Sequence, residues 1–215
     1  MQLTGTAARA TTWLRSLQKP PCRRIEKALT LARDILSCRR APGHLVRHSE
    51  KVTSVALAVG RRLRAAGHSL DLAQLGIAAM CHDVGRTDPD PETAAGLGHA
   101  AASARILERE NLGHLAPAVT NHILPAILNP GLSDDLLEKV LFYADKVVGL
   151  DYMGIHPRLD EFCVRRPDLR PNVEETRAPL VQLENELAGA ADLTAEALQT
   201  ICYLAALSEI VAVQG

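Results

Sequence analysis

The chain has 215 residues, of which 47% are hydrophobic and 3% aromatic, and its formal net charge is -1. An apolar fraction of this size can fill a substantial core and excludes a disordered tail, while the balanced charge gives no reason to expect a nucleic-acid partner. Alanine and leucine are plentiful and aromatic residues are few, so we expect an all-α protein.

The first 40 residues are basic, with nine Lys or Arg residues against two acidic ones. Helices are expected at about 7–18 and 23–38, because Pro20 and Pro21 stop the first of them. We interpret residues 1–40 as a basic N-terminal helical extension that is exposed to solvent. A transit peptide or a surface for anions is the alternative interpretation of the same charges.

Hydrophobic periodicity predicts further helices along the rest of the chain. Their expected ranges are 44–66, 71–82, 98–110, 114–123, 134–149, 174–188 and 194–212. Ser133 and Thr194 are expected N-caps, because a hydroxyl can accept hydrogen bonds from free first-turn amides. The segment 156–172 is rich in proline and arginine, so we expect a partly ordered, mobile flap there. The helix 194–212 is apolar on too many faces for an isolated surface helix, so it should pack in the core or across a subunit boundary, as in a homodimer.

Five cysteines occur without a CxxC spacing, and their number is odd. Reduced thiols in a cytoplasmic protein are the simplest account of this pattern. No apolar run reaches the roughly 18 residues that a membrane-spanning helix needs, so no membrane partner is expected.

Several of the predicted helices place titratable side chains on their apolar faces. His48, for example, continues a stripe formed by Val52, Val55, Val59 and Leu63 at helical spacing. The residues of this kind, or at the end of an apolar helix, are His48, His82, Asp83, His99, His122 and Asp145. Taken singly, each histidine is more often an ordinary core residue, and Asp145 is compatible with a buried ion pair.

Carboxylates are strongly penalised in an apolar interior unless cations or several donors meet them. A shared metal centre removes this penalty for all six side chains together, so the joint pattern favours metal binding. Imidazole and carboxylate donors suit divalent Mn, Fe, Co, Ni or Zn, whereas Mg prefers more oxygen ligands.

The order His48, His82-Asp83 and Asp145 resembles the H…HD…D signature of the HD superfamily of metal-dependent phosphohydrolases. The sequence "CHDVGR" is similar to the family's common "HDIGK", and "LLEKVLFYADKVVG" to the helix that supplies its last aspartate. The resemblance covers residues 41–160 and implies an all-helical domain in which these four residues bind the metal.

His99 and His122 match the two additional histidines of the binuclear subgroup, in which the aspartate corresponding to Asp83 bridges two ions. The resemblance therefore implies one or two divalent ions as cofactor. We divide the chain into the extension 1–40, an HD phosphohydrolase core over 41–160, and a flap with C-terminal helices over 161–215 that packs on the same domain.

The resemblance implies hydrolysis of a phosphoester or phosphoanhydride bond in a phosphorylated small molecule, a nucleotide or a dinucleoside polyphosphate, by a metal-activated water. Asp83 and Arg86 are the expected catalytic residues, and Arg86 stands where the family usually has lysine. A di-iron oxygenase with the same ligands, or a nucleotide-binding sensor without turnover, is the alternative.

Positive and polar groups near the motifs are the candidates for binding substrate. Arg86 is the first choice, because its planar guanidinium keeps the positive charge of the usual lysine. The others are Lys146, His44, Arg47 and Lys51. For each of these four, an ordinary solvent-exposed side chain is the alternative.

Overall fold

The computed structural model describes residues 22–90, 93–94, 98–129 and 131–208. Over these residues the protein is helical and contains no β-strand, apart from an isolated bridge between Val148 and Tyr152. The expectation of an all-α fold is confirmed. The expected helix at 7–18 lies outside the described residues. None of the described helices has the length and apolar character needed to cross a membrane.

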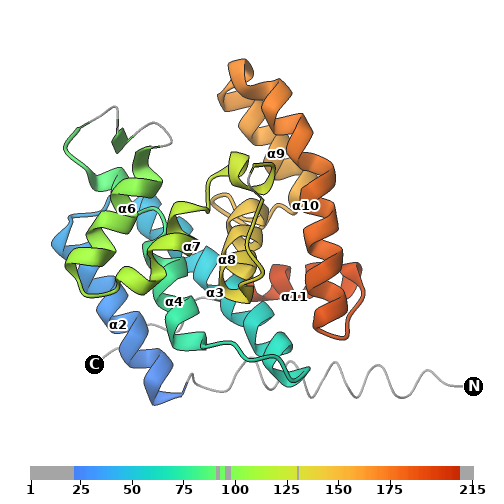
Figure 1. Ribbon diagram of the computed structural model, residues 1–215, viewed down its shortest axis with the longest axis horizontal. Helices are drawn as coiled ribbons and strands as arrows, with labels where there is room; N and C mark the ends of the chain where they lie inside the picture. Colours follow the sequence, from blue (N-terminus) through green and yellow to red (C-terminus); the bar gives the residue numbers. More distant parts are fainter. Residues whose placement is uncertain (1–21, 91–92, 95–97, 130, 209–215) are drawn as a thin grey trace, which may run out of the picture.

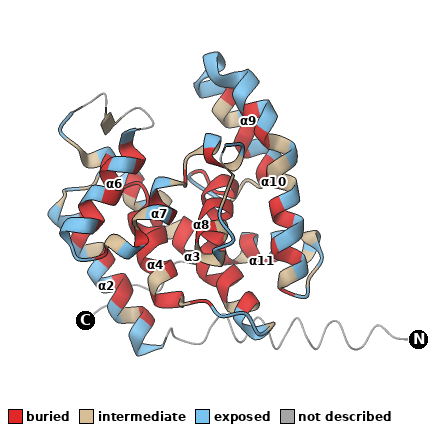
Figure 2. Cartoon of the chain, in the orientation of Figure 1, coloured by how far each residue is buried: buried red, intermediate tan, exposed pale blue. Residues whose placement is uncertain are grey.

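The first part of the fold is a layer of three helices around an apolar core. α2 (Arg23–Cys38) packs against α4 (Leu72–Cys81), and α4 packs against the long α3 (Gly43–Ala65) (Figure 1). Every residue of α4 except Gln74 is buried, because the helix lies between its neighbours. Figure 2 shows that the buried residues of these helices face the centre of the molecule and the exposed residues face outward.

The second part carries the chain around the end of α4. A 3₁₀ turn, η1 (Val84–Thr87), follows α4 directly and packs against α6 (Gly98–Arg109). The chain continues through η2 (Gly113–Leu115), α7 (Ala116–Thr120) and η3 (Leu124–Ile127) to α8 (Leu136–Val147), which packs on α3. The expected single helix at 114–123 is therefore wrong in detail, since a 3₁₀ turn and a five-residue helix occupy that range.

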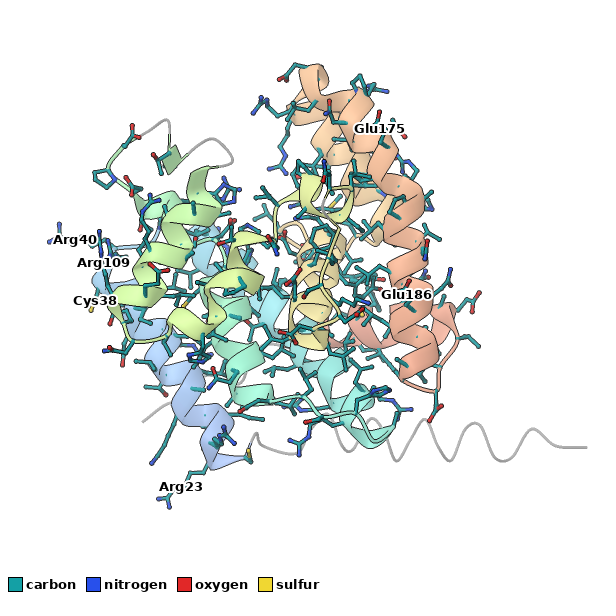
Figure 3. All side chains as sticks on the ribbon, in the orientation of Figure 1. Arg23, Cys38, Arg40, Arg109, Glu175 and Glu186 are labelled. Atoms are coloured by element: carbon teal, nitrogen blue, oxygen red, sulfur yellow. The ribbon has the colours of Figure 1, made fainter. Side chains whose placement is uncertain are left out.

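The third part contains α9 (Ile155–Arg165), η4 (Pro167–Leu169), α10 (Arg170–Ala190) and α11 (Ala195–Leu207). α9 and α10 pack together, while α11 packs against α3. Figure 3 shows Glu175 and Glu186 on the outer face of α10, as expected for a helix that buries its other face. The flap predicted at 156–172 is wrong, because α9, η4 and the start of α10 fill this range.

The prolines that suggested a flap lie where a helix tolerates them. Pro157 falls in the first turn of α9, and Pro171 in the first turn of α10. The first amides of a helix have no intrahelical acceptor, so a residue without an N–H group loses no bond there. Thr194 caps α11 as predicted, with Oγ1 accepting from the Ala197 amide at 3.3 Å. Ser133 is not a cap, because Asp135 caps α8 instead.

Candidate metal centre

Side chains from five separate segments meet between α4, α6 and α8. His48 comes from α3, His82 and Asp83 from the residues after α4, and His99 from the start of α6. His122 follows α7, and Asp145 comes from the last turns of α8. The cluster is buried except for His48, whose side chain is 12% exposed. The structure thus brings all six candidate donors together.

Backbone carbonyls fix the orientation of three of the histidine rings. In each ring Nδ1 lies at hydrogen-bond distance from a main-chain oxygen, and a carbonyl can only accept, so Nδ1 carries a proton. The pairs are His48 with Gly149 at 2.9 Å, His82 with Ala79 at 2.8 Å and His122 with Val119 at 2.6 Å. In the neutral rings Nε2 therefore presents its lone pair to the cluster, as a metal ligand must.

His48, His82 and Asp145 form the first group of donors. Asp145 Oδ1 lies 3.1 Å from His48 Nε2 and 3.5 Å from His82 Nε2. All three of these atoms are acceptors when the rings are neutral. Their ligand atoms lie within 4.8 Å of one another, so the group could hold a metal ion.

His82, Asp83 and His122 form a second group of the same kind. Asp83 Oδ1 lies 3.3 Å from His122 Nε2 and 3.0 Å from His99 Nε2. The two imidazole nitrogens of His99 and His122 are themselves 3.0 Å apart. Arg86 Nη2, which can only donate, lies 3.2 Å from His99 Nε2. His99 Nε2 therefore accepts this hydrogen bond. Three acceptor atoms, His99 Nε2, His122 Nε2 and Asp83 Oδ1, thus lie close to one another.

Buried atoms without partners support a cation at this position. His82 Nε2 and Asp83 Oδ1 are buried and make no hydrogen bond within the described residues, because the atoms nearest to them in the cluster are acceptors as well. A buried polar atom without a hydrogen bond costs about 1–3 kcal/mol. A divalent ion would satisfy both atoms with the coordination that imidazole and carboxylate prefer, so the residues fit a metal.

The pKa values of the two aspartates also indicate that the site favours positive charge. Burial alone would raise the pKa of Asp83, but His82, His122, His99 and Arg86 outweigh it and hold that pKa well below the usual range. The pKa of Asp145 is likewise lowered, because Lys146, His48 and His82 outweigh its burial. Both carboxyl groups are therefore ionised at neutral pH.

The two carboxylates act differently on two of the histidines. Burial opposes protonation of His82, yet Asp83 and Asp145 outweigh it and raise the pKa of His82. Burial dominates at His122 and lowers its pKa to about 4. The carboxylates thus favour a positive charge at His82, and a divalent cation bound by the same residues would supply it.

The comparison with protein families agrees with this geometry. Residues 45–150 match the family model described as "HD domain". The chain contains an HD domain over this range. No curated protein and no solved structure matches it. The match starts just before His48 and ends just after Asp145, so it spans all six candidate donors. An HD domain suggests metal-dependent hydrolase activity.

Lys146 of the HD domain is buried, with a side chain only 3% exposed. Its Nζ forms an ion pair with Asp145 Oδ2 and lies 5.1 Å from the centre of the Phe142 ring. The alternative of an ordinary surface lysine is therefore wrong. The ammonium group neutralises the carboxylate oxygen that points away from the histidines.

Arg86 lies at the edge of the cluster, where its side chain is 40% exposed and its Nε donates to Asp83 Oδ2 at 2.7 Å. The three other candidates lie outside the donor cluster. His44 and Arg47 are exposed on the first turns of α3. Lys51 donates to Asp151 Oδ1 at 2.6 Å and to the Ala206 carbonyl at 3.1 Å. Their expected role in binding substrate stays a prediction.

The sequence reasoning missed Arg158 and Arg165, because it treated their segment as a flap. A helical signal was present, since Ile155, Leu159 and Cys163 repeat at a spacing of four residues and are all buried in α9. A cavity is lined by Tyr152 and by residues of α9, α10 and α11, and none of the six candidate donors lines it.

Proposed function

We propose that this HD-domain protein is a metal-dependent phosphohydrolase that cleaves a phosphoester or phosphoanhydride bond of a nucleotide or dinucleoside polyphosphate. The observation that carries the proposal is the convergence of lone pairs from His48, His82, His122 and two ionised carboxylates on one buried place. Such an arrangement is unfavourable without a divalent cation and is suited to binding one or two of them.

The donor set favours Mn, Fe, Co, Ni or Zn, with Mg also able to bind. When bound, divalent ions lower the pKa of coordinated water towards about 7 and polarise a phosphoryl oxygen. His48, His82 and Asp145 would hold one ion. Asp83, with His99 and His122, would complete the site for a second.

The surrounding residues would prepare the site for a charged substrate. The Arg86 guanidinium is half-exposed beside Asp83, where it could donate hydrogen bonds to an oxygen of the phosphoryl group and stabilise developing negative charge. Lys146 would balance Asp145, so that the centre keeps enough positive charge to attract an anion.

The test is a phosphate-release screen of nucleotides and dinucleoside polyphosphates with Mn, Co, Ni, Fe or Mg added. We expect metal-dependent release by the parent protein, and at least about 100-fold less by Asp83→Ala, because metal coordination contributes several kcal/mol to transition-state stabilisation. Release that is unaffected by Asp83→Ala, or no release with any metal, would contradict the proposal.

Running the screen without oxygen separates the proposal from the oxygenase that uses the same ligands. A hydrolase releases phosphate under anaerobic conditions, whereas an oxygenase consumes oxygen and depends on bound iron. Ligand-induced thermal stabilisation without any product would indicate a nucleotide sensor instead.

A further inference from the structure

Two arginines lie on one face of α9, the helix that follows the HD domain match. Arg158 and Arg165 are seven residues apart, and Glu161 and Phe162 lie between them at spacings of three and four. Residues at these spacings share a helix face, so their side chains are neighbours.

Glu161 and Phe162 hold the two guanidinium groups together. Glu161 Oε2 pairs with Arg158 Nη1, and Oε1 lies 3.6 Å from Arg165 Nε. Both guanidinium groups also lie over the Phe162 ring, at 4.4 Å for Arg158 and 5.1 Å for Arg165. The single carboxylate of Glu161 thus lies between two guanidinium groups, so these three side chains together carry a net positive charge.

This arginine pair lies against the backbone that orients the metal site. A Cβ atom added to Gly149 would come within 3.3 Å of Glu161 Oε2 and 3.7 Å of Arg158 Nη1. The carbonyl of the same Gly149 accepts the hydrogen bond from His48. Burial, followed by the positive charges of Arg158 and Arg86, lowers the pKa of Arg165, whereas Glu161 and Asp145 oppose this effect.

The pair has unused hydrogen-bonding capacity. The Arg158 side chain is only 7% exposed, and its buried Nε has no hydrogen-bond partner among the described residues. An unpaired N–H group on a buried cation is costly, and so is the repulsion between neighbouring guanidinium groups. An anion would relieve both, and guanidinium groups suit phosphate because they can donate two parallel hydrogen bonds.

We propose that Arg158 and Arg165 bind a second phosphoryl group of the substrate, next to the one that is attacked beside Arg86. The protein would then prefer substrates with at least two phosphoryl groups, such as nucleoside triphosphates, over monophosphate esters. This inference rests on the proposed function for the cleavage step, but the anion site itself can be tested without turnover.

The kinetic test uses Arg165→Ala in the metal-loaded full chain, because the Arg165 side chain is 52% exposed and its loss should leave the fold intact. We expect KM for a nucleoside triphosphate to rise about 10- to 100-fold, as for the loss of a charge-assisted contact, with little change in kcat. KM for p-nitrophenyl phosphate, which has one phosphoryl group, should change less than about 2-fold. An equal rise for both substrates would overturn the inference.

Arg166→Ala is the matched control, because Arg166 is the next residue and its guanidinium pairs with Asp168 at 2.8 Å. It removes the same charge from the same helix end without touching the arginine pair, so both KM values should stay as in the parent. Arg165→Lys keeps the charge without the planar fork, and a partial recovery of triphosphate KM is expected.

The binding test measures the affinity of the metal-loaded full chain for inorganic pyrophosphate and for orthophosphate by calorimetry. We expect Arg165→Ala to weaken pyrophosphate binding about 10-fold and to leave orthophosphate binding unchanged. Equal pyrophosphate affinity in parent and variant rejects the anion site. If pyrophosphate binding depends on Arg165 but no phosphate compound is hydrolysed, the anion site stands and the proposed hydrolase function fails.

Discussion

Gly85 lies so close to α6 that no larger residue fits there. A Cβ atom at this position would come within 2.1 Å of the His99 carbonyl oxygen and 2.6 Å of the Ser103 amide nitrogen. The Gly85 amide also donates to Ser103 Oγ at 2.7 Å. The glycine of "HDVG" is therefore needed for the close approach of two backbones, which positions His99 beside Asp83.

Gly85→Ala should separate η1 from α6 and displace His99. We expect the free energy of unfolding to fall by about 1–3 kcal/mol, as in other overpacked sites, and metal affinity to fall with it. Urea denaturation and a metal titration measure the two effects. The control is Gly189→Ala on α10, where nothing lies within 4 Å of an added Cβ and stability should rise by up to about 1 kcal/mol. Unchanged stability and metal binding in Gly85→Ala would show that the backbones can separate freely.

At this scale the sequence predicted the side chains that converge in the cluster, but not the orientation of every side chain. His48 and Asp145 follow apolar stripes that periodicity detects, and the structure places both in the cluster. The sequence did not decide whether Lys146 is buried or exposed to solvent, because its burial depends on the Phe142 ring and Asp145 as neighbours. Arg158 was missed, since its role depends on Gly149 and on packing that no local pattern reveals.

At the scale of elements, a polar network around the buried Tyr143 and Glu184 joins α8, α10 and α11. Tyr143 of α8 donates to Glu184 Oε1 at 2.8 Å, and Gln199 of α11 donates to Glu184 Oε2 at 2.8 Å. Burial and the neighbouring Cys202 and Glu184 raise the pKa of Tyr143, so its hydroxyl keeps its proton and remains a donor. The network fixes the C-terminal helices to the helix that carries Asp145.

Tyr143→Phe removes one donor from this network and leaves Glu184 Oε1 buried without its bond. We expect a loss of about 1–3 kcal/mol in the free energy of unfolding, with metal content unchanged because the donor cluster is not touched. Chemical denaturation and metal analysis check both statements. Tyr203→Phe, at a position that is 49% exposed, should change stability by less than about 0.5 kcal/mol. Equal effects at the two tyrosines would contradict the role of the network.

Helices with regular apolar spacing were predicted from the sequence, whereas the short length of α7 and the presence of α9 were missed. α7 has only five residues, so it contains less than two turns of pattern. α9 was missed because Pro157 and several arginines lie among its buried residues, such as Leu159 and Cys163, and made the segment look irregular. Proline terminates a helix only beyond the first turn, and the position of a first turn is difficult to predict without the structure.

At the scale of the whole molecule, the donor cluster connects helices that are distant in sequence. His48 and Asp145 are 97 residues apart, and α6 and α7 contribute through His99 and His122. An ion bound to these residues would cross-link α3, α4, α6, α7 and α8. The convergence of these segments follows from the HD resemblance, since helix prediction alone does not state which helices meet.

Metal binding should therefore stabilise the whole fold. An ion present at 100 times its Kd contributes about 2.7 kcal/mol to the free energy of unfolding if it binds only the folded state. Thermal denaturation should show a higher Tm with Mn or Zn and a lower one after chelation. Asp145→Ala should lose the metal-dependent part of the shift. A Tm that chelation leaves unchanged would contradict a metal centre in this cluster.

The burial of the five cysteine thiols provides a test of how the whole molecule packs. Cys22 and Cys38 are exposed, whereas Cys81, Cys163 and Cys202 are buried, and burial raises the pKa of both Cys81 and Cys202 to about 12. A disulfide reagent at pH 8 should titrate two thiols quickly in the native protein and five in denaturant, because the reagent reaches exposed thiols and not buried ones. The double variant Cys22→Ser/Cys38→Ser should show no fast phase. A third fast thiol would indicate a looser core.

The hydrogen bonds that orient the His82 and His122 rings couple the metal centre to the ends of two helices. Each ring bonds the carbonyl three residues earlier, at the end of α4 and of α7, where a helix leaves its last carbonyls unpaired. Fraying of either helix end therefore releases an imidazole, and an occupied centre must suppress that fraying. Amide hydrogen exchange near Ala79 and Val119 should therefore slow when metal is added. We expect local opening at these two helix ends to limit the rate at which the ion dissociates.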